Sequence, residues 1–452
     1  MTQLIQHYVS RQAIQRPHHT AIVCKQELIP YAELDQITNQ IADKLRSCGC
    51  RNGDRVGLLL PKSPNAIFAM LGALKADCVY VPIDPDSSAA QVARIVKSVE
   101  PKVLVSARST TALLDDAFAE HDLSSEIQIG TLEAFKLNGK HFEASFTGND
   151  VLQVSSKQRI YERKPTDPAA IFFPSQEADS HKGVVISHAN IIYFLEWALK
   201  YFQIDEYDRL SGFVPPHSEL SAFDTFGAFA AGAELHLVPT KLNQQPRELA
   251  EFIRWHELTQ WASTPAVLNA LVQSDVVVDG DFPSLKRMLW SRGVLPTPSL
   301  IHLMQRLPLT QFTNLYGTAE TTIASSSFTV PTCPSDEAAQ IPIGRPCAGV
   351  GLFVLDDELQ PVALHEVGEL YVGGVGLSSG YWRNQLQTDA AFVQHPVLSQ
   401  RLFKTGDLAR FGSDGLAFFV DRTTIQEESG DCSTVSKRFV DDESLETQLT
   451  YK

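Results

Sequence analysis

The residue types most suggestive of chemistry lie at 171–183, in the stretch IFFPSQEADSHKG. An apolar run leads into this segment, Lys182 and a second apolar run lead out of it, and Ser187 then begins a helix-like pattern. A strand, a loop and a helix in this order typically frame a phosphate-binding turn, whose glycines allow backbone N–H groups to approach the anion. Here Glu177 and Asp179 stand in the loop. The frame therefore indicates a nucleotide site, while the loop itself does not suit a chain of phosphates.

Four further stretches stand out, and three of them combine glycine turns with polar groups or tyrosines. They are LKADCVYVPIDP (74–85), NLYGTAETT (314–322), GELYVGGVGLSSGYW (368–382) and KTGDLARFGSDG (404–415). Each alone is a weak signal, because Gly-Asp and Tyr-Gly turns are usually only turns. Their information lies in their order along the chain.

The elements that must position these groups follow from hydrophobic periodicity. Leu34, Ile37, Ile41 and Leu45 fall on one helical face and predict a helix from Tyr31 that ends near residue 49. Predicted strands follow at 55–60, 78–84 and 102–106, and they alternate with predicted helices at 64–76 and 89–99. This alternation predicts a parallel sheet with helices on its faces.

A second α/β pattern follows a less regular segment at 121–168. This segment includes the stretches TGND (147–150) and SSKQRIYERKPTDP (155–168), which we interpret as surface excursion. The second pattern predicts a strand at 232–239 and helices at 187–202, 246–258 and 298–308, the last two on either side of the run LKRMLW (285–290). After residue 344, alternating residues and turn signals indicate a small β-rich unit. We expect an α/β protein with two parallel-sheet subdomains in 1–345, a β-barrel-like subdomain in 346–421 and a short polar tail in 422–452.

Composition and charge limit the class of function. A net charge of −15 argues against a nucleic-acid or anionic-membrane partner, because nothing offsets the repulsion from phosphates. The seven cysteines form no CxxC pair and are interpreted as reduced thiols. The N-terminus lacks a secretory signal pattern, and no apolar run is long enough to span a bilayer. These features predict a cytoplasmic protein that handles small molecules.

The ordered stretches, together with YAEL (31–34) and HKGVVISHAN (181–190), resemble the core motifs of the adenylate-forming superfamily. The resemblance covers about residues 1–425. It is strongest to amino-acid adenylation domains of nonribosomal peptide synthesis, and among these to free-standing ligases that load amino acids onto carrier proteins. It implies the large N-terminal core of that fold and ATP or AMP with Mg²⁺ as cofactors. In the implied reaction a carboxylate attacks the α-phosphate of ATP, and pyrophosphate leaves.

The resemblance also implies roles for residues at matching positions. The implied nucleotide and catalytic residues are Tyr316 on the adenine, Gly317 in the turn beside it, Glu320 on Mg²⁺ and in catalysis, Asp407 on the ribose, Arg422 at a hinge, and Ser175 and Lys182 in the phosphate loop, with Lys182 also catalytic. Glu219 replaces the aspartate that pairs with the substrate's α-ammonium, so a carboxylate is kept but lengthened by one methylene. Leu220, Phe223 and Ser263 would line the side-chain pocket, which suggests a small or moderately apolar amino acid.

Several positions depart from the family pattern. Glu177 and Asp179 place carboxylates where the triphosphate should lie, and close like charges repel. Arg292 and Gly293 stand where relatives carry a Gly-Glu pair, and Ala319 replaces a hydroxyl residue that helps to hold phosphate. The sequence ends 30 residues after residue 422, so we expect the family's lysine-bearing C-terminal domain to be missing.

Two functions remain open after this comparison. One is an active adenylating ligase that a separate C-terminal domain completes. The other is a pseudoenzyme with lost or strongly reduced adenylation, which would act as a binding partner of a carrier protein or of a paralogous adenylation enzyme. A coenzyme-A ligase fits less well, because the context of Glu219 and Phe223 is of the amino-acid type. The sequence favours the pseudoenzyme, since the departures gather at one catalytic step while the core elements stay regular.

Overall fold

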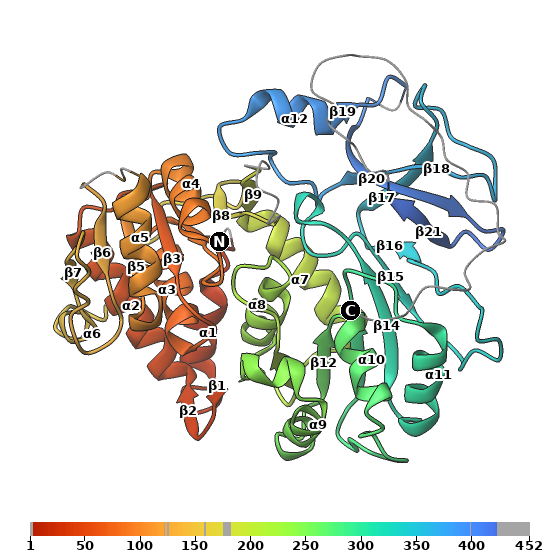
Figure 1. The fold of residues 1–452 in the computed structure, drawn as a ribbon, viewed down its shortest axis with the longest axis horizontal. Coiled ribbons are helices and arrows are strands. Elements are labelled where there is room, and N and C mark those ends of the chain that lie inside the picture. Colours follow the sequence, from red (N-terminus) through yellow and green to blue (C-terminus); the bar gives the residue numbers. More distant parts are fainter. Residues whose placement is uncertain are drawn as a thin grey trace, which may run out of the picture.

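The computed structural model describes residues 3–121, 123, 126–157, 160–174, 182–397 and 399–422. The described chain folds into three sheets, with helices between and around the first two (Figure 1). The third sheet lies at one end of the molecule, next to the carboxyl ends of strands from the second sheet (Figure 1). No helix among these residues is both long and apolar enough to cross a bilayer.

The first sheet is formed by the N-terminal part of the chain. Its order is β7 (Ala144–Phe146), β6 (Gln128–Gly130), β5 (Val103–Ser106), β3 (Arg55–Leu59), β4 (Val79–Pro82), β8 (Pro168–Phe172) and β9 (Val184–Ser187). All neighbouring strands are parallel except β8 and β9, which are antiparallel. The associated helices are α1 (His7–Gln15), α2 (Tyr31–Ser47), α3 (Pro64–Lys75), α4 (Ala89–Val99), α5 (Thr111–His121) and α6 (Gly148–Leu152), with a short 3₁₀ turn η1 (Arg108–Thr110).

The second sheet is larger and recruits the start of the chain. Its order is β16 (Arg345–Pro346), β15 (Ser326–Thr329), β14 (Gln311–Tyr316), β13 (Arg287–Trp290), β12 (Gln260–Ser263), β10 (Arg209–Gly212), β11 (Glu234–Leu237), β1 (Thr20–Cys24) and β2 (Glu27–Pro30). Its central strands β14, β13, β12, β10, β11 and β1 are parallel. Its helices are α7 (His188–Phe202), α8 (Ser221–Ala231), α9 (Pro246–Trp255), α10 (Pro265–Gln273) and α11 (Thr297–Arg306), with 3₁₀ turns η2 (Thr240–Gln244) and η3 (Ala319–Thr321).

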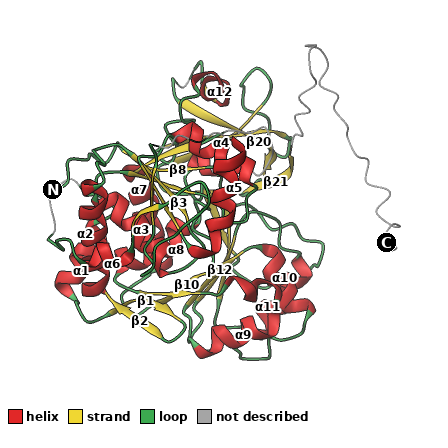
Figure 2. Cartoon of the chain, turned by 60° about the vertical axis from the view of Figure 1, so that its left-hand side comes forward, coloured by secondary structure: helices red, strands yellow, loops and turns green. Residues whose placement is uncertain are grey.

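The third sheet is antiparallel throughout and curls into a half-barrel. Its order is β17 (Val350–Leu355), β18 (Gly368–Gly374), β20 (Arg401–Phe411) and β19 (Phe392–Gln394), and β21 (Ala417–Arg422) pairs with β20. Helix α12 (Gln385–Ala391) lies beside β19 (Figures 1 and 2). The pairing of β20 with β21 shifts register between Leu408 and Ala409, directly after Asp407.

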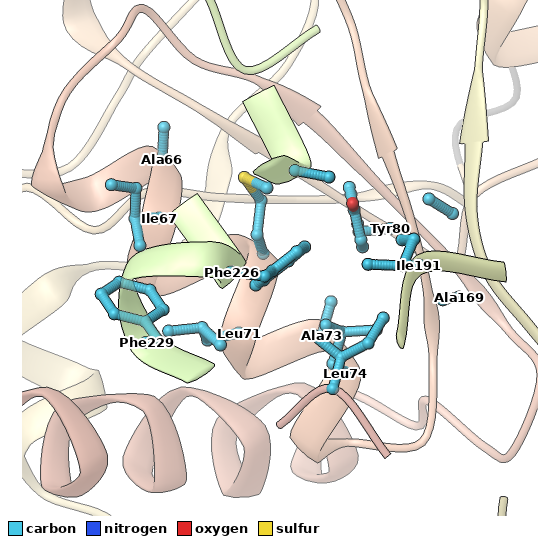
Figure 3. Packing of buried hydrophobic residues seen from close by; sticks show 14 of the residues in the cluster. Ala66, Ile67, Leu71, Ala73, Leu74, Tyr80, Ala169, Ile191, Phe226 and Phe229 are labelled. Carbon is cyan, nitrogen blue, oxygen red and sulfur yellow. The ribbon is translucent and has the colours of Figure 1, made fainter. Parts of the chain in front are cut away.

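A shared core fixes the first two sheets relative to each other. Leu71 and Leu74 of α3 pack in the same buried cluster as Phe226 and Phe229 of α8 (Figure 3). Tyr80 of β4 lies edge-on to Phe226, with ring centroids 6.4 Å apart. Each such fully buried side chain contributes about 1.5–3 kcal/mol. The strand ends of both sheets are therefore held as one rigid frame.

The predicted fold class is confirmed, and so are most predicted elements. The helix predicted from Tyr31 is α2, and the predicted strand-helix alternation from 55 to 106 is the parallel run β3, α3, β4, α4, β5. None of the described residues of 147–150 and 155–168 is buried, which agrees with the interpretation of these stretches as surface excursion. The same irregular segment also holds two strands that were not predicted, β6 and β7, which join the first sheet. These strands have three residues each, which is too short for a periodic signal. The domain division at 345 and 421 stays a prediction.

Candidate functional site

A cavity of about 340 Å³ opens at the carboxyl ends of parallel strands from both sheets. Its walls come from the segments that follow β4, β8, β10, β12 and β13. Ligands of α/β proteins bind at this edge of the sheet, where loops from several strands meet. The volume is that of a small organic ligand.

An ion pair between a buried carboxylate and a more exposed guanidinium forms part of the cavity wall. The Nη2 of Arg292 donates to both Oε1 and Oε2 of Glu219, each at 2.5 Å. The Glu219 side chain is 3% exposed, and that of Arg292 is 39% exposed. Arg292 has a φ of +65° and the following Gly293 a φ of +156°. A non-glycine residue in the left-handed region is uncommon and often marks a functional position.

Two further polar side chains of the cavity wall, Ser263 and His217, have polar partners, whereas the buried Oγ of Ser218 has no hydrogen-bond partner among the described residues. The Oγ of Ser263 accepts a hydrogen bond from Nε1 of Trp261 at 2.9 Å. The Nε2 of His217 lies 3.6 Å from Oδ2 of Asp84. Burial lowers the pKa of His217 from its ordinary 6.5, against the raising effect of Asp84, so its imidazole is neutral at pH 7.

The structure brings three of the four predicted pocket residues to this cavity. Glu219, Leu220 and Ser263 line it. Phe223, on α8, is fully buried, is not part of the cavity wall and lies edge-on to Phe194 at 5.3 Å. The reason is its position on the helix, since α8 begins at Ser221 and turns this side chain into the core.

A second group of predicted residues meets where β14 ends against the third sheet. The hydroxyl of Tyr316 donates to Oδ2 of Asp407 at 2.6 Å, and Nε of Arg422 donates to Oδ1 at 2.7 Å. The carboxylate of Asp407 is 3% exposed, whereas the side chain of Arg422 is 65% exposed. Burial raises the pKa of Tyr316 well above 10, and Asp407 raises it further, so the hydroxyl stays a donor.

A third group joins the end of the predicted phosphate loop to the third sheet. The hydroxyl of Tyr381 donates to Oε1 of Glu320 at 2.9 Å. The Nζ of Lys182 lies 5.7 Å from the centre of the Tyr381 ring, within the range of a cation–π contact. The backbone of Trp382 donates to the carbonyl of Gly183 at 2.7 Å, which fixes the two segments side by side.

The turn between these two groups has a strained and crowded backbone. Gly317 allows it, because a Cβ at this position would come within 2.6 Å of the Cα of Ala324. Thr322 and Ile323 have φ angles of +59° and +67°. Positive φ is rare for β-branched residues and indicates a conformation that the surrounding structure enforces. The turn thus holds Tyr316 and Glu320 at a fixed spacing.

Ser175 lies outside the described residues. The sequence marked Arg292 only as a departure from the family's Gly-Glu pair, and its ion pair with Glu219 was not predicted. Tyr381 was not predicted as a site residue. The available signal was its place near the end of the glycine-rich stretch GELYVGGVGLSSGYW (368–382). The described residues contain no group of three or more ligating side chains that could hold a metal alone.

Solved structures define the class of this fold. Over 94% of the chain, the structure is similar to a nonribosomal peptide synthetase, FmoA3, solved with α-methyl-L-serine-AMP bound, with a TM-score of 0.83 and 26% sequence identity. The same synthetase with AMPPNP bound gives a TM-score of 0.83 over 93% of the chain. The chain spans 45% and 43% of those two longer chains. The fold is therefore the adenylate-forming fold of adenylation domains.

Sequence comparison gives the family. Residues 9–382 match the family described as AMP-binding enzyme, and the chain belongs to it. An L-proline–[L-prolyl-carrier protein] ligase of Streptomyces coelicolor is 31% identical over 398 residues, which cover 86% of this chain and 72% of the relative. A dimodular nonribosomal peptide synthase of Bacillus subtilis is 29% identical over 93% of this chain, which spans only 17% of that much longer protein.

Proposed function

We propose that this protein binds an adenylate-type ligand, with AMP or ATP as its nucleotide part, and that it forms adenylates weakly or not at all. The observation that carries this proposal is the ion pair in the cavity wall. Both carboxylate oxygens of Glu219 accept hydrogen bonds from Arg292, so this guanidinium is already neutralised. An adenylating site must bring a carboxylate and a triphosphate together, which requires cations that are available to both.

The residues present fit the nucleoside part of such a ligand. Asp407 offers a buried carboxylate to the two ribose hydroxyls, and the exposed Arg422 side chain can leave at little cost. The ring of Tyr316, which is partly buried against the core of the third sheet, would stack on the adenine. ATP, when bound, supplies the α-phosphate that a carboxylate attacks. Mg²⁺ would be held by Glu320 together with phosphate oxygens, since Mg²⁺ often uses one protein carboxylate and its substrate.

The sequence adds a reason for weak catalysis. Glu177 and Asp179 belong to the segment between β8 and β9, where the triphosphate would lie. Two carboxylates there oppose the binding of further negative charge. AMP or an acyl-adenylate carries fewer phosphate charges, so its binding suffers less from this opposition.

A second candidate is an active ligase that transfers an amino acid to a carrier protein, with the help of a separate C-terminal domain. The observation in its favour is the third group, in which Lys182, Tyr381 and Glu320 lie close together. The identity to the L-proline–[L-prolyl-carrier protein] ligase points the same way. On either proposal the partners are a small acid and a carrier protein or a paralogous adenylation enzyme.

ATP–pyrophosphate exchange separates the two candidates. The purified protein is assayed with a panel of amino acids that includes proline, alanine and serine, while AMP binding is measured in parallel by titration calorimetry. We expect AMP to bind and no acid to give exchange above the blank. Exchange that depends on one amino acid and is lost in Asp407→Ala would establish the active ligase instead.

A further inference from the structure

The cavity's ion pair points to the class of acid that this site takes. We propose that the cavity selects carboxylic acids with an oxygen substituent at C2, as in 2-hydroxy and 2-oxo acids, and rejects acids with an ammonium group there. Arg292 is then the specificity-determining residue. This inference rests on the proposed function only in that the cavity holds the acid part of the ligand.

The first argument is the state of the cavity's two carboxylates. A ligand ammonium needs a carboxylate that can accept its hydrogen bonds, because an unpaired buried charge is costly. Both oxygens of Glu219 already accept from Arg292. Oδ1 of Asp84 accepts from the backbone N–H of Asp86 at 2.9 Å, and its Oδ2 faces His217. Within the described wall, each carboxylate is therefore already engaged.

The second argument concerns whether an ammonium could displace Arg292. The backbone at Arg292 and Gly293 takes unusual φ angles that direct this one side chain to Glu219. An ammonium that approached Glu219 would also lie close to the guanidinium, and like charges in a partly shielded site repel. The carboxylate that both cations would share is 3% exposed, while the guanidinium is 39% exposed, so solvent screens this repulsion only in part.

The third argument concerns the N–H donors of Arg292 that do not bond to Glu219. A guanidinium carries five N–H donors, and the bonds to Glu219 use only those of Nη2. The N–H groups of Nε and Nη1 suit an oxygen acceptor, such as a hydroxyl or a ketone, which adds no charge beside Glu219. The neutral imidazole of His217 adds a second polar group to the same wall.

The rest of the wall defines the remainder of the ligand. One part of it is apolar and is formed by Ile95, Phe173, Phe213, Val214 and Leu220, while Ser87, Gln91, Arg94, Ser98 and Thr264 form a polar part. The apolar part suits an aliphatic or aromatic side chain of moderate size. The complete ligand class is thus a 2-hydroxy or 2-oxo acid with an apolar side chain.

The test uses matched acids that differ only at C2. One set is L-valine, 2-hydroxy-3-methylbutanoate and 3-methyl-2-oxobutanoate, and a second set is L-phenylalanine, phenyllactate and phenylpyruvate. Each acid is titrated calorimetrically into the full chain, in the absence and in the presence of saturating AMP. In at least one set, we expect an oxygen-substituted acid to bind at least about ten-fold tighter than its amino acid.

Two variants connect the preference to the ion pair. Arg292→Gly frees Glu219, and we expect it to reverse the preference by at least about ten-fold toward the amino acid. Glycine also suits the positive φ of this position. In the double variant Arg292→Gly/Glu219→Gln, the gain for the amino acid should vanish, because the acceptor charge has been removed. Should Arg292→Gly fail to fold, Glu219→Gln alone must keep the preference for the oxygen acids.

Three results would overturn the inference: tighter binding of an amino acid by the unmodified protein, equal binding within both sets, or no binding of any of these acids up to about 10 mM. A failure of the proposed function is seen separately. It would appear as absent AMP binding or as acid-dependent pyrophosphate exchange, and neither readout depends on which acid of a set binds more tightly.

Discussion

The buried carboxylate of Asp407 offers the sharpest test of the nucleotide site. In the structure it accepts from Tyr316 at 2.6 Å and from Arg422 at 2.7 and 3.4 Å. The substitution Asp407→Asn keeps the size of the side chain and one acceptor oxygen, but it removes the charge. The substitution therefore lowers both the free energy of unfolding and the affinity for AMP, and the effect on AMP affinity should be the larger one.

The effect on stability should be small. The Arg422 side chain is 65% exposed, so its ion pair contributes only about 0–1 kcal/mol. The hydroxyl of Tyr316 can still donate to the amide oxygen, with a loss of about 1 kcal/mol for the weaker acceptor. We expect Asp407→Asn to lower the free energy of unfolding by about 1–2 kcal/mol, measured by urea denaturation.

The effect on AMP binding should be larger. Hydrogen bonds to a charged group contribute about 1.5–3 kcal/mol, against about 0.5–1.5 kcal/mol for neutral pairs. The two ribose hydroxyls together then lose about 2 kcal/mol, which corresponds to a roughly 30-fold weaker AMP affinity by calorimetry. The control is Asp421→Asn, an exposed carboxylate on the neighbouring strand β21, which should leave AMP affinity unchanged. Equal AMP affinity in both variants would refute the assignment of Asp407 to the ribose.

Three further predictions concern stability, and each is measured by urea denaturation. Gly344→Ala should lower the free energy of unfolding by about 2–4 kcal/mol, because φ is +92° and the new Cβ would collide with the backbone of Ser327. Arg287→Met should cost about 3 kcal/mol, because its guanidinium lies 2.7 Å from a fully buried carboxylate of Asp208. In the unmodified protein, the free energy of unfolding should fall by about 2 kcal/mol from pH 6.5 to pH 5. Burial lowers the folded-state pKa of His188 from 6.5 to about 3, so only the unfolded chain gains the proton in that interval. His188→Leu should abolish this fall.

Each of these variants has a matched control. Gly280→Ala has a similar φ of +70° but no atom within 4 Å of the new Cβ, so it should cost only about 1–2 kcal/mol. Lys286→Met removes the 52% exposed partner of the same buried carboxylate and should cost less than about 1 kcal/mol. His18→Gln changes an exposed histidine and serves as the control for the loss of a histidine side chain. A variant that behaves like its control would show the corresponding explanation to be wrong.

The sequence was sufficient for the elements whose apolar residues repeat with a clear period. The helix from Tyr31 and the run from β3 to β5 were predicted because burial of one face leaves a pattern in the residues themselves. The edge strands β6 and β7 were not predicted, since three residues give no period and their pairing depends on a neighbouring strand. The N-terminal hairpin β1–β2 shows the same limit, because its place beside β11 follows from tertiary contacts more than 200 residues apart in the chain.

The site shows why single positions are harder to interpret than elements. Glu219 and Arg292 are 73 residues apart in sequence, and each alone counts as a departure from a motif. In space they form one pair, in which both carboxylate oxygens of Glu219 accept hydrogen bonds from Arg292. Two independent losses would have left a buried carboxylate or a strained arginine without a partner, and such groups are costly. The pair therefore changes what the cavity can bind and does not simply damage it, which is why its test is a comparison of ligands and not of stability.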